Sequence, residues 1–442
     1  MAFKILSLDG GGSWAMIQAR VLLDMHGDIR GHAVLRQFDL AIANSGGSLV
    51  LAALCNDMLL SEIIGVFENE GQRQQVFSAL TFKEKLQNPA SFLQKPFGMG
   101  PKYDTVQKLA GLTRVLADAD HHYQEDKTRQ PVVGMFLDEI PAMIGKNYQS
   151  KDLQLVIVGF DYFRRRVNFF RSSQKSTSNR FSPEFFRVRL GHAIHASSNA
   201  PVNYFDDPAT VILTSSSSND TRSSWFWDGA VSGFNNPVLA GLTEAITNGV
   251  PAADCRILSI GTGTGQRAII TDYGTSSNTG LQEIYQANLD NPLVITDYNF
   301  SFLRDVDEMA TSILADPPDS DTFIAYAMVR PSLDNKGAIV RINPCLSPVL
   351  NPETKLYECP ACYNGDDAAR ANFRALLDLD MDAVLQEQVA LIRELCDKFL
   401  DCRPGMPRVA NQLIRGDLTT GHIGQPDYCA AKDRWRDIER MK

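Results

Sequence analysis

Short apolar runs alternate with amphipathic segments along the first 265 residues of the chain. The runs are rich in Val, Ile and Leu, and several end at a glycine-rich turn, which is typical of buried strands. The predicted strands lie at residues 3–8, 38–43, 153–161 and 256–260. Helical patterns follow the first two strands and precede the fourth. This order predicts an α/β fold, a three-layer α/β/α sandwich with a central, mostly parallel sheet.

Residues 60–150 are more polar, and proline or glycine interrupts their helical pattern at several points. We expect this stretch to form helices that cover one side of the sheet and to include a candidate lid. Further on, residues 323–329 form another predicted strand, and residues 381–400 predict a long helix. We therefore expect a main α/β domain at residues 1–349 and a helical extension at residues 350–442 that packs on the same body.

The charge balance restricts the partners of the protein. The 442 residues carry a net charge of −9 at pH 7. This acidity argues against a nucleic-acid partner, because phosphate binding needs a basic face. It also weakens attraction to anionic membranes, so contact with a lipid surface should be local and apolar.

No stretch approaches the roughly 18–20 apolar residues that a membrane-spanning helix needs. The first predicted strand begins at residue 3 and leaves no room for a signal peptide. We therefore expect a cytoplasmic protein without a transmembrane segment, unless a signal-independent route exports it.

Eight cysteines are scattered along the chain, and we expect most of them to be packing residues. Cys359 and Cys362 have the spacing of half a zinc site, but no second pair of this kind accompanies them. We expect neither a metal ion nor a cofactor.

One serine lies at a sharp turn between a strand and a helix. The turn reads Ala43-Asn44-Ser45-Gly46-Gly47 and approximates the Gly-x-Ser-x-Gly pattern of a nucleophile elbow. Small residues at 43, 46 and 47 allow the strand and the helix to pass close together. Such a turn exposes the hydroxyl near the N–H groups of a helix N-terminus, which stabilise negative charge. The alternative is a glycine-rich turn without chemistry.

Three glycines, Gly10, Gly11 and Gly12, follow the first strand. Their amides are unshielded at a helix N-terminus, which makes an anion site. A phosphate cradle and an oxyanion hole both use such amides. The lysine of a Walker loop and the spacing of a dinucleotide fingerprint are both missing. The oxyanion hole is favoured, because the turn at Ser45 also ends a core strand.

Four blocks in this order together resemble the patatin-like phospholipase family. They are residues 9–12, the turn at Ser45, the Ala-Ser-Ser-x-Ala-Pro block within residues 193–205, and Asp228-Gly229-Ala230 with its downstream Asn-Asn-Pro. Two neighbouring positions differ from the family pattern. Trp14 and Ala15 occupy the sites where the family usually has a basic residue and a glycine.

The resemblance implies a lipid acyl hydrolase of phospholipase A type that uses two residues rather than a triad. Ser45 would be the nucleophile, Asp228 the base, and the glycine loop the oxyanion hole. An acyl-enzyme would form and react with water, without a metal ion. The partners implied are a lipid or acyl-ester substrate and, transiently, a membrane or micelle surface. A carboxylesterase or thioesterase with soluble substrates, and a catalytically weakened binding or regulatory protein, are the alternatives.

A carboxylate must be partly desolvated to act as this base, and the apolar residues at 225–227 are consistent with such a setting. Histidines at 192 and 195 leave a Ser-His-Asp triad open, although we expect them to be packing or helix-end residues.

Overall fold

The computed structural model describes most of the chain. The described residues are 2–77, 80, 101–145, 153–173, 186–201, 204–265, 318–329, 337–346, 349–350, 357–377, 379–403, 406 and 424–440. The candidate lid within residues 60–150 is therefore covered only in part, since 81–100 and 146–150 lie outside the described residues.

A nine-stranded sheet forms the centre of the described part of the chain. Neighbouring strands run in the order β10-β8-β1-β2-β3-β7-β6-β5, and β4 pairs with β3 outside this path. The pairs from β10 to β3 are parallel, and the pairs that involve β4, β5, β6 and β7 are antiparallel. The strands are β1 (Phe3–Leu8), β2 (Leu40–Ala43), β3 (Gln154–Asp161), β4 (Arg166–Arg171), β5 (Phe186–Val188), β6 (Ala209–Ser215), β7 (Thr221–Asp228), β8 (Cys255–Ile260) and β10 (Ile339–Ile342).

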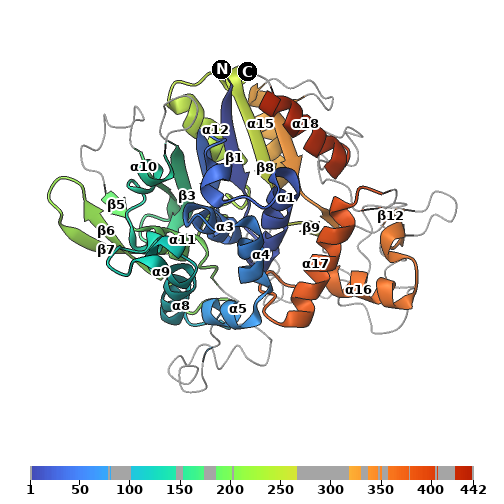
Figure 1. Cartoon of the computed structure of the whole chain (residues 1–442), viewed down its shortest axis with the longest axis horizontal. Helices are drawn as coiled ribbons and strands as arrows, with labels where there is room; N and C mark the ends of the chain where they lie inside the picture. Colours follow the sequence, from blue (N-terminus) through green and yellow to red (C-terminus); the bar gives the residue numbers. More distant parts are fainter. Residues whose placement is uncertain are drawn as a thin grey trace.

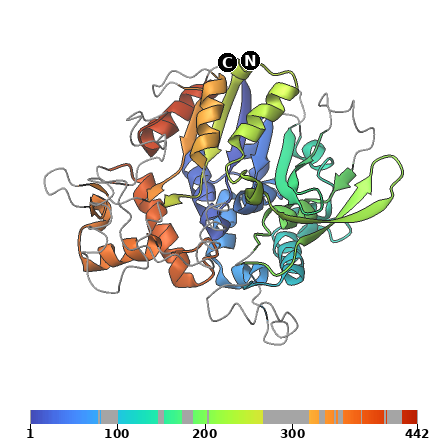
Figure 2. The same ribbon diagram turned by 180° about the vertical axis from the view of Figure 1, so that it is seen from behind.

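Helices cover both faces of this sheet, which confirms the predicted sandwich (Figures 1 and 2). Side chains alternate between the faces along each strand, so Leu6 and Ile5 of β1 enter different cores. Leu6 packs in the core that includes α1, α3 and α11, whereas Ile5 packs with α12 and α15. The helices are α1 (Met16–His26), α2 (Gly31–Leu35), α3 (Ser45–Cys55), α4 (Leu60–Glu68), α5 (Glu70–Val76), α8 (Thr105–Asp118), α9 (His121–Glu125), α10 (Ile140–Ile144), α11 (Leu190–Ser197), α12 (Val238–Thr247), α15 (Pro318–Val329), α16 (Asp367–Leu377), α17 (Gln386–Leu400) and α18 (Tyr428–Arg440).

The prediction of a strand at residues 323–329 is wrong, because this segment belongs to α15. Its buried side chains are Ala325, Tyr326 and Val329, which pack in one core with α12, while Phe323 and Ile324 are exposed. A spacing of three and four residues is that of a helix face. The continuous apolar run conceals this spacing.

The last helices pack on the α/β body. Trp435 of α18 stacks on Phe38 with ring centroids 5.7 Å apart, and α17 contacts α1. Tyr428 donates a hydrogen bond of 2.5 Å to Asp24 of α1, and so does Lys432.

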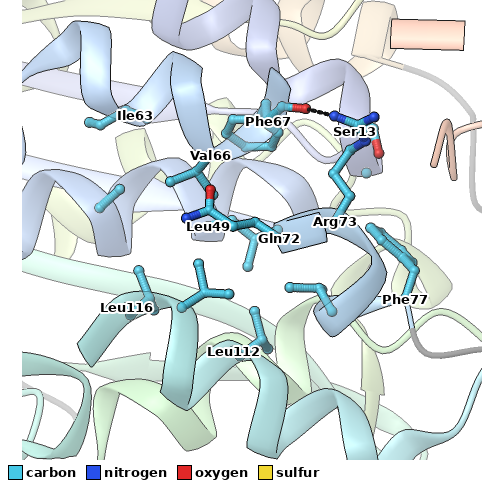
Figure 3. Close-up of a pocket in the computed structure, with 14 residues that line it drawn as sticks. Ser13, Leu49, Ile63, Val66, Phe67, Gln72, Arg73, Phe77, Leu112 and Leu116 are labelled. Atoms are coloured by element: carbon cyan, nitrogen blue, oxygen red, sulfur yellow. Dashed lines mark hydrogen bonds between the residues drawn. The ribbon is translucent and has the colours of Figure 1, made fainter. Parts of the chain in front are cut away.

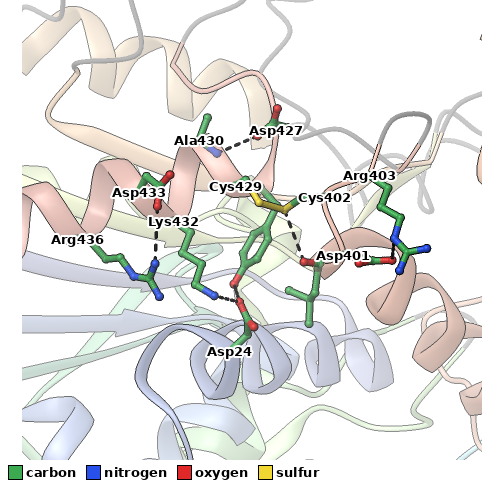
Figure 4. Close-up of a disulfide and its surroundings, with 12 residues drawn as sticks. Asp24, Asp401, Cys402, Arg403, Asp427, Cys429, Ala430, Lys432, Asp433 and Arg436 are labelled. Carbon is green, nitrogen blue, oxygen red and sulfur yellow. Dashed lines mark hydrogen bonds and ion pairs between the residues drawn. A yellow bond between two sulfur atoms is a disulfide. The ribbon is translucent and has the colours of Figure 1, made fainter.

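A disulfide joins Cys402, just after α17, to Cys429 of α18 (Figure 4). The prediction that most of the cysteines are packing residues stands beside this pair, because Cys55, Cys255 and Cys396 are buried free thiols. Disulfides persist mainly in oxidising compartments, and the cytoplasmic location stays a prediction. No helix in the described ranges is both long and apolar enough to cross a lipid bilayer.

Candidate active site

Strand β3 brings together two turns that are far apart in the sequence. Along one edge it first pairs with parallel β2, up to the pair Ala43–Ile157. Antiparallel β7 then takes over the same edge, starting with the pair Gly159–Asp228, since β4 occupies the other edge. Thus β2 and β7 approach each other head-on, and the residues that follow Ala43 meet Asp228.

Ser45 occupies a strained turn at the start of α3. Its φ of 48° lies in the left-handed region, which non-glycine residues rarely adopt outside special sites. The Ser45 amide donates to the hydroxyl of Ser197 at 2.9 Å. The strand and the helix pass close together at this turn. Ala43 is fully buried, and a Cβ on Gly46 would lie 2.5 Å from the carbonyl oxygen of Gly12. A Cβ on Gly47 would lie 2.6 Å from the carbonyl oxygen of Asp9.

The carboxylate of Asp228 is buried and hydrogen-bonded. Its Oδ1 accepts from Asn44 Nδ2 at 3.1 Å and from the Ala230 amide at 2.9 Å. The Ser45 side chain lies near enough to the carboxylate to lower its pKa. Burial raises the pKa of Asp228, and these hydrogen bonds partly oppose the rise. Ser45 and Asp228 therefore meet, as the sequence predicted. Of the apolar residues before Asp228, Phe226 is buried and Trp225 is exposed.

The glycine loop lies against the turn at Ser45. A Cβ on Gly10 would lie 2.8 Å from the Cβ of Ser45, and Gly12 has a φ of 55°. The amide of Gly10 donates to the carbonyl oxygen of Asn235 at 2.8 Å. The amides of Gly11 and Gly12 meet no acceptor among the residues that the structure describes. Of the three predicted amides, these two are available to an anion.

A buried ion pair holds the start of this loop. Arg341 of β10 is fully buried and donates to Asp9 Oδ2 at 2.5 Å and to Ser259 Oγ at 2.8 Å. Burial raises the pKa of Asp9, while Arg341 opposes the rise. Burial also raises the pKa of the neighbouring Asp321 to about 7, helped by the charge of Asp9 and opposed by Arg341.

A buried lysine beside Ser45 and Asp228 was not predicted from the sequence. Lys108 of α8 lies with its Nζ 3.3 Å from the carbonyl oxygen of His195 and 4.2 Å from the ring centroid of Phe205. Burial lowers its pKa well below the usual value, and the charge of Asp228 opposes this. The sequence pattern could have indicated its burial, because Lys108 lies one turn before Leu112 on the apolar face of α8.

Trp14 and His195 are not part of the arrangement of Ser45 with Asp228. The Trp14 indole is buried and donates to the carbonyl oxygen of Asp380 at 3.1 Å. His195 is buried, and burial together with the charge of Lys108 lowers its pKa well below the usual value. Within the described residues, its ring forms no hydrogen bond with Ser45 or Asp228.

Two adjoining cavities open from this site. One, of about 380 Å³ including space open to solvent, is lined by Ser45, Lys108 and Phe205 among others. The second, of about 580 Å³ on the same measure, lies between α3, α4, α5 and α8. Four residues line both cavities: Gly12, Leu49, Val76 and Phe77. The walls of the second are almost entirely apolar, with Leu112 and Leu116 facing Leu49 and Val66 (Figure 3).

The model of the patatin-like phospholipase family matches residues 6–242. This is more than half of the chain, and the protein belongs to that family. Membership supports a lipid hydrolase activity.

Two solved structures match the chain at low similarity. The chain resembles ExoU of Pseudomonas aeruginosa, solved in complex with SpcU, at 13% identity and a TM-score of 0.22, over 45% of this chain and 38% of ExoU. It resembles VipD from Legionella pneumophila at 8% identity and a TM-score of 0.31, over 89% of this chain and 67% of VipD. No curated protein sequence matches.

We predict that Arg341→Met lowers the free energy of unfolding by about 3–5 kcal/mol, because it leaves the Asp9 carboxylate buried without its cation. Adding Asp9→Asn to this variant should restore part of the loss. Denaturant unfolding measures both, with the exposed Arg440→Met as a control of little effect. A loss below about 1 kcal/mol for Arg341→Met would show that the pair does not hold the loop.

Proposed function

We propose that the protein hydrolyses acyl esters of lipids, with Ser45 as nucleophile and Asp228 as general base. The observation that carries this proposal is the close approach of a strained serine to a buried carboxylate, beside glycine amides that meet no acceptor among the described residues. A serine hydroxyl is a weak nucleophile and needs a base within hydrogen-bond reach.

In the first half of the reaction, Asp228 takes the proton of the Ser45 hydroxyl while Oγ forms a bond to the acyl carbon. The amides of Gly11 and Gly12 stabilise the oxyanion, and Gly10 positions the loop through its bond to Asn235. The intermediate then collapses, the ester bond breaks, and Asp228 gives its proton to the leaving alcohol. An acyl group remains on Ser45.

In the second half, Asp228 takes a proton from water as the water oxygen attacks the acyl-enzyme. Collapse of the second intermediate releases the fatty acid, and Ser45 regains its proton from Asp228. Every proton that leaves Ser45 or water passes through one carboxylate, so no histidine and no metal ion enters these steps.

The apolar cavity favours a lipid over a small soluble ester. It adjoins the cavity that Ser45 lines and offers an apolar surface for an acyl chain. Each methylene moved from water into such a site contributes about 0.8 kcal/mol. A phospholipase A-type reaction with a long acyl chain uses this cavity, whereas a short acyl ester leaves it empty.

The test of the proposed dyad uses three variants and a long-chain ester. Ser45→Ala and Asp228→Asn should each reduce kcat/KM at least about a thousandfold, since each removes a group that the reaction needs. His195→Gln should retain most of the activity. Circular dichroism confirms that each variant folds. Loss of activity in the His195 variant with the fold intact would replace the dyad with a triad.

The acyl cavity has its own test. Ala53 lines it, and Ala53→Leu should fill space that the end of a chain would occupy. We expect kcat/KM for a palmitoyl ester to fall about tenfold. For a butyryl ester, kcat/KM should stay close to the value of the unsubstituted protein. The matched change Leu49→Ile keeps the volume of the wall and should spare both substrates. An equal loss for both esters would mean that the cavity does not hold the chain.

The pH profile follows from the raised pKa of Asp228. The base must be ionised, so activity should fall as the pH drops through this pKa, at a higher pH than for an ordinary aspartate. The charge of Lys108 lowers the pKa of Asp228. Lys108→Met should therefore move the acid limb of kcat/KM to still higher pH. A limb that stays in place would indicate that another group controls it.

A further inference from the structure

Three aromatic side chains lie exposed beside one another on the surface. Tyr162 and Phe163 follow β3, and Trp225 belongs to β7. Their exposed fractions are 44%, 62% and 43%. The ring centroids of Phe163 and Trp225 are 5.1 Å apart, and those of Tyr162 and Trp225 are 5.9 Å apart. We call these three residues the aromatic platform.

Three arginines follow Phe163: Arg164 and Arg165 lie in the turn after β3, and Arg166 begins β4. Arg164 forms an ion pair with Asp161 at 2.7 Å. Arg165, with a φ of 53°, and Arg166 are exposed, and no described residue forms an ion pair with either. The turn is thus locally cationic on a chain with a net charge of −9. Positive charge and exposed aromatic area therefore lie together at this turn, and both favour an anionic lipid surface.

The platform lies on the side of the sheet where β2 ends. β2 stops opposite Ile157, and β3 continues to Asp161, about 13 Å further along the strand. Trp227 shares a face of β7 with Trp225 and packs on the cluster that includes Tyr204 and Phe205. Both of these residues line the cavity that contains Ser45. Aromatic side chains therefore run from the exposed platform to the wall of the site.

We propose that the aromatic platform and its arginines dock the protein on an anionic lipid surface. Tyr and Trp prefer the interface between headgroups and acyl chains, and Arg binds phosphate oxygens in a bidentate manner. Docked in this way, the molecule holds the Ser45 cavity near the layer that contains its substrate. The role of this docking surface in lipid hydrolysis rests on the proposed function. Binding to lipid is measured separately, without catalysis.

A protein partner would also use exposed aromatic and arginine side chains. The position beside the cavity and the unpaired arginines favour the lipid surface. A lipid surface requires binding that rises with the content of anionic lipid and falls with salt.

The test is sedimentation of the full chain with vesicles of phosphatidylcholine alone or mixed with phosphatidylglycerol. Binding is measured in the Ser45→Ala background, so the lipid stays intact whether or not the enzyme proposal holds. We expect tighter binding to the anionic vesicles. Phe163→Ser should weaken it about tenfold, and Arg165→Gln and Arg166→Gln about fivefold each. The matched control is Ile324→Ser, which should bind like the parent. Ile324 is 44% exposed and belongs to α15, a helix that packs with α12 rather than with β7.

A second readout separates this proposal from the proposed function. With Ser45 restored, Phe163→Ser should hydrolyse a soluble butyryl ester like the unchanged chain and lose activity only on vesicles. Failure of the parent to bind anionic vesicles or equal binding to both kinds of vesicle would overturn the docking surface. So would undiminished binding by the variants at Phe163, Arg165 and Arg166. If the unchanged chain binds anionic vesicles but does not hydrolyse the soluble ester, the result contradicts the enzyme proposal and leaves the docking surface standing.

Discussion

One edge of strand β3 is the constraint on which the site depends. The edge serves parallel β2 along its first part and antiparallel β7 along its second, so the two strands end facing each other. Backbone hydrogen bonds in the sheet thereby set the separation of Ser45 and Asp228. The approach is close: a Cβ on Gly229 would lie 2.4 Å from Asn44 Oδ1. A glycine directly after Asp228 is therefore part of the same arrangement.

The site concentrates features that destabilise a fold unless they are compensated. Ser45 has a left-handed backbone, and Asp9, Lys108 and Asp228 are buried ionisable residues. Each has a specific support. The Ser197 hydroxyl accepts from the Ser45 amide, and Arg341 pairs with Asp9. Asn44 and the Ala230 amide donate to Asp228. Lys108 donates to the carbonyl oxygen of His195. Strain and buried charge held in this way are typical of functional sites.

Sequence patterns predicted those parts of the molecule that local chemistry determines. The strands were recognisable because buried parallel strands are nearly continuous apolar runs, and the turn at Ser45 and Asp228 were recognisable from short motifs. Lys108 and Arg341 were not, because their partners come from distant elements and no local spacing links them. The pairing of Cys402 with Cys429 depends likewise on the docking of α18. At residues 323–329 the continuous apolar run concealed a helical face.

The central claim is that Asp228 activates the hydroxyl of Ser45. Reaction of the folded protein with a long-chain alkyl fluorophosphonate, followed by mass spectrometry of its peptides, tests this claim most directly, because such probes modify activated serines. We expect one adduct, on Ser45, whose formation slows greatly in Asp228→Asn. No adduct on Ser45, or an adduct that forms equally fast without the Asp228 carboxylate, would contradict it.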